Sequence, residues 1–493
     1  MATAPLSNGL SPGRGAKGVA GELAIGHRAL RMPLAWRDAI VFGTLAGAIG
    51  AALLWLGPPG ADTAAHVYQR DLFRSEGFVT WDNFWYSGRH VFVTYSWLYY
   101  PLAAVVGIKL LAALSLAVAA AAFTRLVEWT PATLTFALVW GLYALSGAYP
   151  FMLGVAFASL ALLTRRSWAF AALAALAWAA SPLAVLLLAV VVVGMRRWRA
   201  AVYVLALIAF QIVLAHVYHG RGHFPFPWGE LIAALVFAGG GTIVARGPVR
   251  RFFAAYLAFV LLAFAFQSQL GENAARLRYM AIPLSLLAVR RRPLWVGVPL
   301  VALCVSYNLS PLTWNFVKGA DERADHRSYW SPALDFLHAH RDPNFRVNAL
   351  DTVGHWEAVY VPEAGFPITR GWYRQDDFPE NEILYSDDLN RKTYVRWLHE
   401  RGVRYVLVPS DRLDYSSRRE AVVAAKLHLV TRRGDVSIYE APDPVPIAPG
   451  ATILRLTHES VTLRVPRKGR YTLAIRGHET FDAPRAGTYT LRF

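Results

Sequence analysis

Residues 38–57 read DAIVFGTLAGAIGAALLWLG, and after two prolines residues 60–90 read GADTAAHVYQRDLFRSEGFVTWDNFWYSGRH. The first stretch carries a single charge, Asp38, and has the roughly 20 apolar residues that a transmembrane helix needs. It is too long for the core of a signal peptide and lacks a convincing cleavage site. We therefore expect it to remain in the protein as a membrane anchor.

Further apolar runs follow along the chain. The candidate spans are residues 102–124, 131–148, 149–164, 199–217, 229–245, 252–268, 277–289 and 294–311. Several are short, which predicts tilting or burial within a bundle. In residues 168–194, Ser181-Pro182 lies mid-run, and because proline removes a helix hydrogen bond we interpret this stretch as two half-helices, spanning or re-entrant. The sequence thus predicts an α-helical polytopic membrane bundle of about eleven segments.

The arginines indicate the direction of the spans. Residues 1–320 hold 25 of the 50 Lys and Arg but only 9 of the 33 Asp and Glu. If the spans alternate and residues 168–194 enter and return, the arginine clusters fall on one side, which the positive-inside rule identifies as cytoplasmic. These clusters are Arg125, Arg165-Arg166, Arg196-Arg197 with Arg199, Arg246 with Arg250-Arg251, and Arg290-Arg291-Arg292. The N-terminus is then cytoplasmic and the C-terminal region extracytoplasmic, in a multi-pass protein of the plasma membrane.

The composition excludes other classes of protein. The mean hydropathy is +0.32 and 17% of residues are charged, against about a quarter in soluble proteins. Since the basic excess lies in loops between spans, a pI near 10 does not indicate a nucleic-acid partner. The single cysteine, Cys304, lies in an apolar run, so no intramolecular disulfide can form.

The chain divides into four parts. Residues 1–35 read as a disordered cytoplasmic tail, and residues 36–315 as a transmembrane domain with a large outer loop at 58–100. Residues 316–442 read as an extracytoplasmic α/β domain, and residues 443–493 as a small β module, because their apolar residues alternate. Within the α/β domain, strands are expected at 346–351 and 403–409, helices at 391–401 and 416–427, and a hairpin at 428–440.

The loop at 58–100 holds the strongest candidates for chemistry. Asp62 and His66 lie just beyond the first span, where a carboxylate could position or deprotonate a hydroxyl. The alternatives are that Asp62 only caps a helix and that Asp62 and His66 form a local pair four residues apart. Asp71 is flanked by Arg70 and Arg74, which favours a solvated ion pair.

Other residues near the outer face suit an anionic or carbohydrate ligand. Lys109 stands between apolar runs and is a candidate for phosphate binding, or else reaches the headgroups. Arg276, Arg278 and Tyr279 are candidates because outward arginines run against the positive-inside trend, the alternative being a pair with Glu272. The substrate-binding candidates are completed by Trp81 and Trp85, as sugar platforms or as interface-belt aromatics.

Four stretches carry a family resemblance. They are Gly60, Asp62 and His66 in a G-x-D-x-x-x-H pattern, NAARLRYMAIP at 273–283, ITRGWYRQ at 368–375 and GVRYVLVP at 402–409. With them the chain resembles the superfamily of polytopic GT-C glycosyltransferases, and more narrowly the bacterial membrane-protein family labelled as related to pyruvoyl-tetrahydropterin synthase. The superfamily resemblance implies a polyprenyl-phosphate sugar donor, an acidic residue in the first outer loop and an outer C-terminal domain. Many members carry two adjacent acidic residues in that loop, whereas here Thr63 follows Asp62.

The resulting hypothesis is a glycosyltransferase that transfers a hexose or pentose from a polyprenyl-phosphate donor to an envelope glycan or glycolipid on the outer face. Asp62 and His66 are its predicted catalytic residues. Membrane lipids are also expected as partners, and nucleic acid is not. No metal ligands are predicted, although a divalent metal is compatible with the chemistry. The alternatives are a transporter or lipid-handling protein without covalent chemistry, and an envelope assembly protein.

Overall fold

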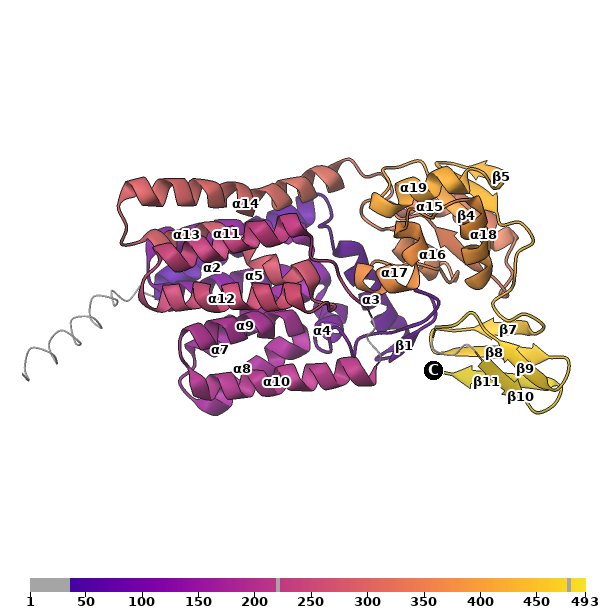
Figure 1. The fold of residues 1–493 in the computed structure, drawn as a ribbon, viewed down its shortest axis with the longest axis horizontal. Helices are drawn as coiled ribbons and strands as arrows, with labels where there is room; N and C mark the ends of the chain where they lie inside the picture. The colour runs from indigo at the N-terminus through magenta and orange to yellow at the C-terminus, as the bar shows by residue number, and fades with distance from the viewer. Residues whose placement is uncertain (1–35, 219–221, 477–479) are drawn as a thin grey trace, which may run out of the picture.

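The computed structural model describes residues 36–218, 222–476 and 480–493, so the tail expected at 1–35 lies outside the described residues. The described chain forms a helical bundle, then a mixed α/β unit, then a small β unit (Figure 1). The helices up to residue 320 are α2 (Trp36–Leu56), α3 (Thr63–Glu76), α4 (Tyr99–Val106), α5 (Ile108–Val127), α6 (Thr130–Leu142), η1 (Tyr143–Ser146), α7 (Tyr149–Leu163), α8 (Ser167–Ala180), α9 (Pro182–Gly194), α10 (Trp198–Val217), α11 (Trp228–Val244), α12 (Gly247–Ala265), η2 (Gly271–Met280), α13 (Ala281–Val289) and α14 (Leu294–Ala320).

The bundle has the composition of membrane helices. In the part of the chain that the structure describes, α2, α5, α10, α12 and α14 are long and apolar enough to cross a membrane, and five shorter apolar helices accompany them. On α10, Val202 and Ile212 are each about two-thirds exposed, as residues facing lipid would be. The expected count of about eleven spans is not confirmed.

Several expected spans have different ends in the structure. Residues 102–124 are interrupted at Gly107, whose φ of +87° ends α4 before α5 begins. Residues 277–289 begin in the 3₁₀ helix η2, and α14 runs well beyond the expected end at residue 311. The stretch 168–194 does form two helices, α8 and α9, which meet at Ser181 as the proline predicts.

Small residues allow α2 to pack closely against α5. A Cβ atom on Gly43 would lie 2.9 Å from the carbonyl oxygen of Ala117 and 3.0 Å from the Cβ of Ala121. Without a side chain at Gly43 the two helix backbones approach each other, as is common between helices in lipid. This contact fixes the end of α2, from which the first loop emerges.

The α/β unit is built on a four-stranded sheet with the order β3-β4-β6-β5. The pair β3–β4 is parallel, whereas β4–β6 and β6–β5 are antiparallel. Its elements are α15 (Arg327–Ala339), β3 (Arg346–Ala349), α16 (Glu357–Glu363), α17 (Arg374–Glu380), η3 (Glu382–Tyr385), α18 (Arg391–Glu400), β4 (Val403–Pro409), α19 (Tyr415–Ala424), β5 (His428–Arg433) and β6 (Val436–Glu440).

Local sequence explains why α18 forms where it was expected. The side chain of Asn390 accepts hydrogen bonds from the backbone N–H groups of Lys392 and Thr393, and Thr393 Oγ1 accepts one from the backbone of Asn390. This reciprocal cap satisfies donors that the first turn leaves open. The buried Tyr394 and Trp397 then turn one face of the helix toward the core.

The last unit contains β7 (Thr452–Leu456), β8 (Ser460–Val465), β9 (Gly469–Thr472), β10 (Thr480–Ala483) and β11 (Gly487–Arg492). Its sheets have the orders β11-β8-β7 and β10-β9. Along β8, Val461, Leu463 and Val465 are buried and alternate with more exposed residues, which gives the period of two seen in the sequence. In Figure 1 this unit lies beside the short strand β1 (Trp81–Asp82), which pairs with β2 (Arg89–His90).

Candidate active site

Asp62 is positioned by direct contact between two backbone segments. The N–H groups of Ala61 and Asp62 donate to the carbonyl oxygens of Leu145 and Ser146, at 3.1 and 3.0 Å. A Cβ atom on Gly60 would lie 2.5 Å from the backbone nitrogen of Gly147, and Gly147 itself has a φ of +68°. Both glycines are therefore needed for the loop after α2 to dock on the turn between η1 and α7.

The carboxylate of Asp62 faces an arginine and not its own helix. Asp62 stands at the N-cap position of α3 but makes no side-chain capping hydrogen bond. Its Oδ2 lies 3.6 Å from Nη2 of Arg276, and the two side chains are 15% and 20% exposed. The capping explanation therefore does not account for this residue.

Neutral groups hold the guanidinium of Arg276. Its Nε donates to Asn273 Oδ1 at 2.8 Å, and its Nη1 donates to the hydroxyl of Tyr143 at 3.2 Å. The guanidinium carbon lies 5.6 Å from the ring centre of Phe151. Nη2 is thus left for an anion, which in the described structure is Asp62.

The electrostatic surroundings make Asp62 a titratable group near neutral pH. Burial raises the pKa of its carboxyl to about 6, although the positive charges of Arg276 and Arg374 lower it. Burial also disfavours the charged form of Arg276, yet neighbouring Tyr143 and Asp62 raise its pKa overall. The result is a poised carboxyl beside a permanent cation.

His66 lies in an aromatic layer next to this pair. It is 1% exposed, and its Nδ1 is 3.1 Å from the hydroxyl of Tyr100. Tyr100 is in turn 3.2 Å from the hydroxyl of Tyr373, in the segment before α17. Burial lowers the pKa of His66 to about 3, so the ring is neutral. The expected alternative of an Asp62–His66 pair does not form, because their described partners are Arg276 and Tyr100.

Among the described residues, Arg276 is the cationic candidate that pairs with Asp62. The other candidates have different partners. Arg278 Nη1 donates to Glu230 Oε2 at 2.6 Å, whereas Glu272 forms no described ion pair with Arg276. Tyr279 packs edge-on against Tyr143, with 4.9 Å between ring centres, and so borders the site. Lys109 lies in the first turn of α5, where its ammonium nitrogen lies 6.0 Å from the ring centre of Trp55 on α2.

The two predicted sugar platforms are buried side chains in this structure. Trp85 is fully buried, its Nε1 donates to the carbonyl oxygen of Ala358, and it stacks on Tyr68 at 4.3 Å. Trp81 is 3% exposed and its Nε1 donates to Asn83. The ring of Trp85 has no exposed face, whereas Trp81 is among the residues that line the cavity described below. Asp71 pairs with Arg70 at 2.6 Å, as the sequence favoured.

The first loop is locked onto the C-terminal units by several buried contacts. Arg89 Nη2 lies 3.1 Å from Asp376 Oδ2, and its guanidinium carbon lies 4.4 Å from the ring centre of Tyr373. Asp82 Oδ1 is 2.9 Å from His458 Nδ1 in the β unit. These contacts bring Tyr373 and Arg374 to the Asp62 side of the bundle, which no local sequence pattern could have indicated.

A cavity of about 1090 Å³ opens between the first loop, the end of α10 and the two C-terminal units. Tyr95, Arg89, Asp376 and Arg476 are among the residues that line it. Tyr95 connects it to the aromatic layer, because its ring stacks with that of His66 at 6.0 Å. The cavity therefore presents an aromatic ring, from Tyr95, and charged groups to a polar ligand.

The similarity of the chain to known proteins is distant. No protein-family model matches the chain, and no curated protein matches it. The chain is similar to the arabinofuranosyltransferase AftD from mycobacteria. The two share 17% sequence identity and a TM-score of 0.43, over 83% of this chain and 40% of that one. For a mutant of AftD the values are 17%, 0.47, 84% and 42%. The chain thus spans about two-fifths of AftD, and the narrower pterin-synthase-related label is not confirmed.

Proposed function

We propose that this chain is a membrane glycosyltransferase of the GT-C type, which transfers a sugar from a polyprenyl-phosphate donor to an envelope glycan or glycolipid. The observation that carries the proposal is the pair of Asp62 and Arg276 just beyond the first span, at 3.6 Å. A lipid-linked donor and a membrane-bound acceptor can both reach that level. Both side chains are largely buried, and charged groups in such a position are costly unless they are paired or bind a ligand.

In the proposed reaction, Arg276 leaves Asp62 and binds the donor phosphate, which offers two oxygens to its planar group. Losing that cation raises the proton affinity of Asp62, whose pKa is already about 6. The carboxylate then takes the proton of an acceptor hydroxyl as that oxygen bonds to the anomeric carbon. The bond from this carbon to the phosphate oxygen breaks, and the electron pair stays on the leaving polyprenyl phosphate. A single displacement of this kind inverts the configuration of the sugar.

The remaining candidates take supporting roles. Tyr143 and Asn273 orient Arg276, and Arg374 contributes a second positive charge that acts on Asp62. The neutral ring of His66 fixes Tyr100 by a hydrogen bond. The cavity beside Tyr95 is the proposed acceptor channel.

The test is mass spectrometry of lipid-linked sugars and envelope glycans from cells with and without the protein. The proposal predicts that one lipid-linked sugar accumulates and one glycan substituent disappears when the chain is absent. Purified wild-type protein in liposomes should also release polyprenyl phosphate from that donor in the presence of acceptor. Movement of the lipid-linked sugar across the bilayer without cleavage would instead support the transporter alternative and overturn the proposal.

A further inference from the structure

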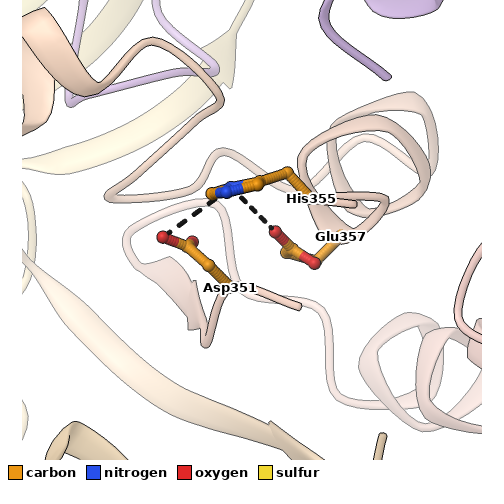
Figure 2. Close-up of side chains that lie close together, drawn as sticks. All are labelled: Asp351, His355 and Glu357. Carbon is orange, nitrogen blue, oxygen red and sulfur yellow. Dashed lines mark ion pairs between the residues drawn. The ribbon is translucent and has the colours of Figure 1, made fainter. Parts of the chain in front are cut away.

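A second polar cluster lies inside the α/β unit, where the turn after β3 leads into the first residue of α16. Asp351, His355 and Glu357 are 3%, 5% and 1% exposed. One ligand atom from each lies within 4.8 Å of the others. The imidazole Nδ1 is 3.8 Å from Asp351 Oδ2 and 3.7 Å from Glu357 Oε1. Figure 2 shows the ring edge directed between the two carboxylates.

Two atoms of this cluster have no hydrogen-bond partner in the described part of the chain. They are His355 Nδ1 and Glu357 Oε1, and both are buried. Leaving polar atoms unpaired in the interior costs free energy, so buried polar atoms usually have a partner and an exception needs an explanation, of which a bound ion is one. Both atoms face the same point between the three side chains, where a cation would satisfy them together.

The surrounding groups are arranged as the supports of metal ligands are. His355 Nε2 lies 3.4 Å from Asp414 Oδ2, the carboxylate–histidine arrangement that orients a ligating imidazole. Glu357 Oε2 accepts hydrogen bonds from the N–H and Oγ1 of Thr352, at 3.1 and 2.9 Å, which leaves Oε1 free. Arg370 Nη2 lies 2.7 Å from Asp351 Oδ2, and this ion pair holds that carboxylate in place.

The backbone of the turn is strained in a way that serves this geometry. His355 has a φ of +59°, a conformation that is uncommon for a residue with a side chain. Such strain persists where the surroundings require it. Here it turns the imidazole back over the end of β3, between Asp351 and Glu357.

The network around the cluster also contains more carboxyl groups than guanidinium groups. The guanidinium of Arg370 is shared by Asp351, Asp377 and Glu420, at 2.7, 2.6 and 3.2 Å. Asp414 is paired with Arg374. With Glu357 included, five carboxyl groups therefore face two guanidiniums in this network. A divalent ion would offset the excess, which is costly inside a protein.

We propose that Asp351, His355 and Glu357 form a binding site for a divalent first-row transition metal. One imidazole nitrogen with two carboxylate oxygens suits Zn²⁺ or Mn²⁺ and disfavours Ca²⁺, which prefers an all-oxygen shell of six to eight ligands. The site does not depend on the proposed transferase activity. It stabilises the turn that precedes α16 and, through Asp414, the side chain of Arg374.

The test uses the full-length protein purified in detergent without chelator. Elemental analysis should find about one equivalent of zinc or manganese per chain. After chelation, titration with Zn²⁺ or Mn²⁺ alone should restore one equivalent and raise the melting temperature, and the two titrations identify the preferred ion. Absence of bound metal together with no binding of either added ion would overturn the proposal.

Two variants keep the test independent of misfolding. His355→Asn removes the ring, and asparagine tolerates the left-handed backbone better than most residues. Glu357→Gln keeps the shape and the contacts to Thr352 but lowers the ligand charge. Each should weaken metal affinity at least about tenfold, whereas His338→Asn, an exposed control outside the cluster, should leave it unchanged. Wild-type affinity in the folded His355→Asn and Glu357→Gln variants would also overturn the site.

Discussion

Arg276 Nη2 lies 3.6 Å from Asp62 Oδ2, although the two residues belong to opposite ends of the helical bundle in sequence. Each brings its own anchors to the contact. Asp62 is held by backbone hydrogen bonds to the end of η1, and Arg276 is held by Asn273 and Tyr143. Because each residue is held by contacts that do not involve the other, a substrate can separate the pair without unfolding the site.

Asp62→Asn should fold normally and lose transfer by at least about a hundredfold, the usual scale of acid–base help. The amide keeps the size of the side chain but cannot take a proton. Stability should change little, because Asp62 makes no capping bond that the substitution would alter. Transfer is measured in liposomes and the melting temperature in detergent. Asp71→Asn, which only breaks a pair with Arg70 on the same loop, is the control, and near-normal transfer by Asp62→Asn would exclude Asp62 as the base.

Arg276→Lys should reduce transfer nearly as much as Arg276→Ala, because an ammonium group cannot make the contacts of a planar guanidinium to Asn273, Tyr143 and a phosphate at once. Glu272→Ala is the matched control on the same 3₁₀ helix, since Glu272 is not the described partner of Arg276. Binding of polyprenyl phosphate to the purified variants separates recognition from catalysis. Equal losses in Arg276→Ala and Glu272→Ala would count against phosphate recognition by Arg276.

The rate of transfer should depend on pH through Asp62. A base must be ionised, so kcat/KM for transfer, which reports the free protein, should rise as the pH increases through about 6, the pKa to which burial raises this carboxyl, and fall as the pH decreases below it. The residual activity of Asp62→Asn should lack this step. A wild-type profile that is flat over about one pH unit on either side of this pKa would contradict the assignment.

Arg89→Ala should destabilise the contact between the first loop and the C-terminal units. Its side chain is 7% exposed and pairs with Asp376, so its removal leaves a buried carboxylate whose one remaining ion pair among the described residues is with Arg476, at 3.4 Å. Breaking a buried pair in this way typically costs about 3–5 kcal/mol, and the remaining partner places the expectation near the lower value. Unfolding in detergent can be followed by tryptophan fluorescence, because Trp85 is buried in the same contact. Arg470→Ala, which breaks an exposed pair with Asp482, should leave the transition unchanged.

The sequence was sufficient where structure is local. The apolar run after Asp38 predicted α2, the stretch at 403–409 predicted β4 at its observed limits, and Ser181-Pro182 predicted the break between α8 and α9. It also placed a carboxylate just beyond the first span. It could not show that Gly107 would adopt a positive φ and divide the next expected span, since glycine also occurs inside helices.

The site was harder to predict because its contacts are long-range. The sequence offered Glu272 as the near partner of Arg276, but the fold brings in Asp62 instead. The sequence offered Trp81 and Trp85 as sugar platforms or interface-belt aromatics, whereas both side chains are buried against the C-terminal units. Asp351, His355 and Glu357 lie within seven residues of one another, yet no familiar ligand spacing marks them. Their burial and the direction of the imidazole became evident only from the turn after β3.

The direction of the chain across the membrane remains a prediction from its arginines, and two matched cysteines can test it. Cys304 is the single native thiol and is 2% exposed, so Cys304→Ala gives a background without reactive cysteine. Lys468→Cys and Arg291→Cys then place one thiol each on exposed residues, the first in the β unit and the second in the loop between α13 and α14. The positive-inside rule predicts that an impermeant thiol reagent labels position 468 in intact cells and position 291 only after the membrane is disrupted. The reverse pattern would place Asp62 and its neighbours on the cytoplasmic side. A donor delivered to the outer leaflet would then be out of reach, and the acceptor would have to be a cytoplasmic molecule instead of an envelope glycan.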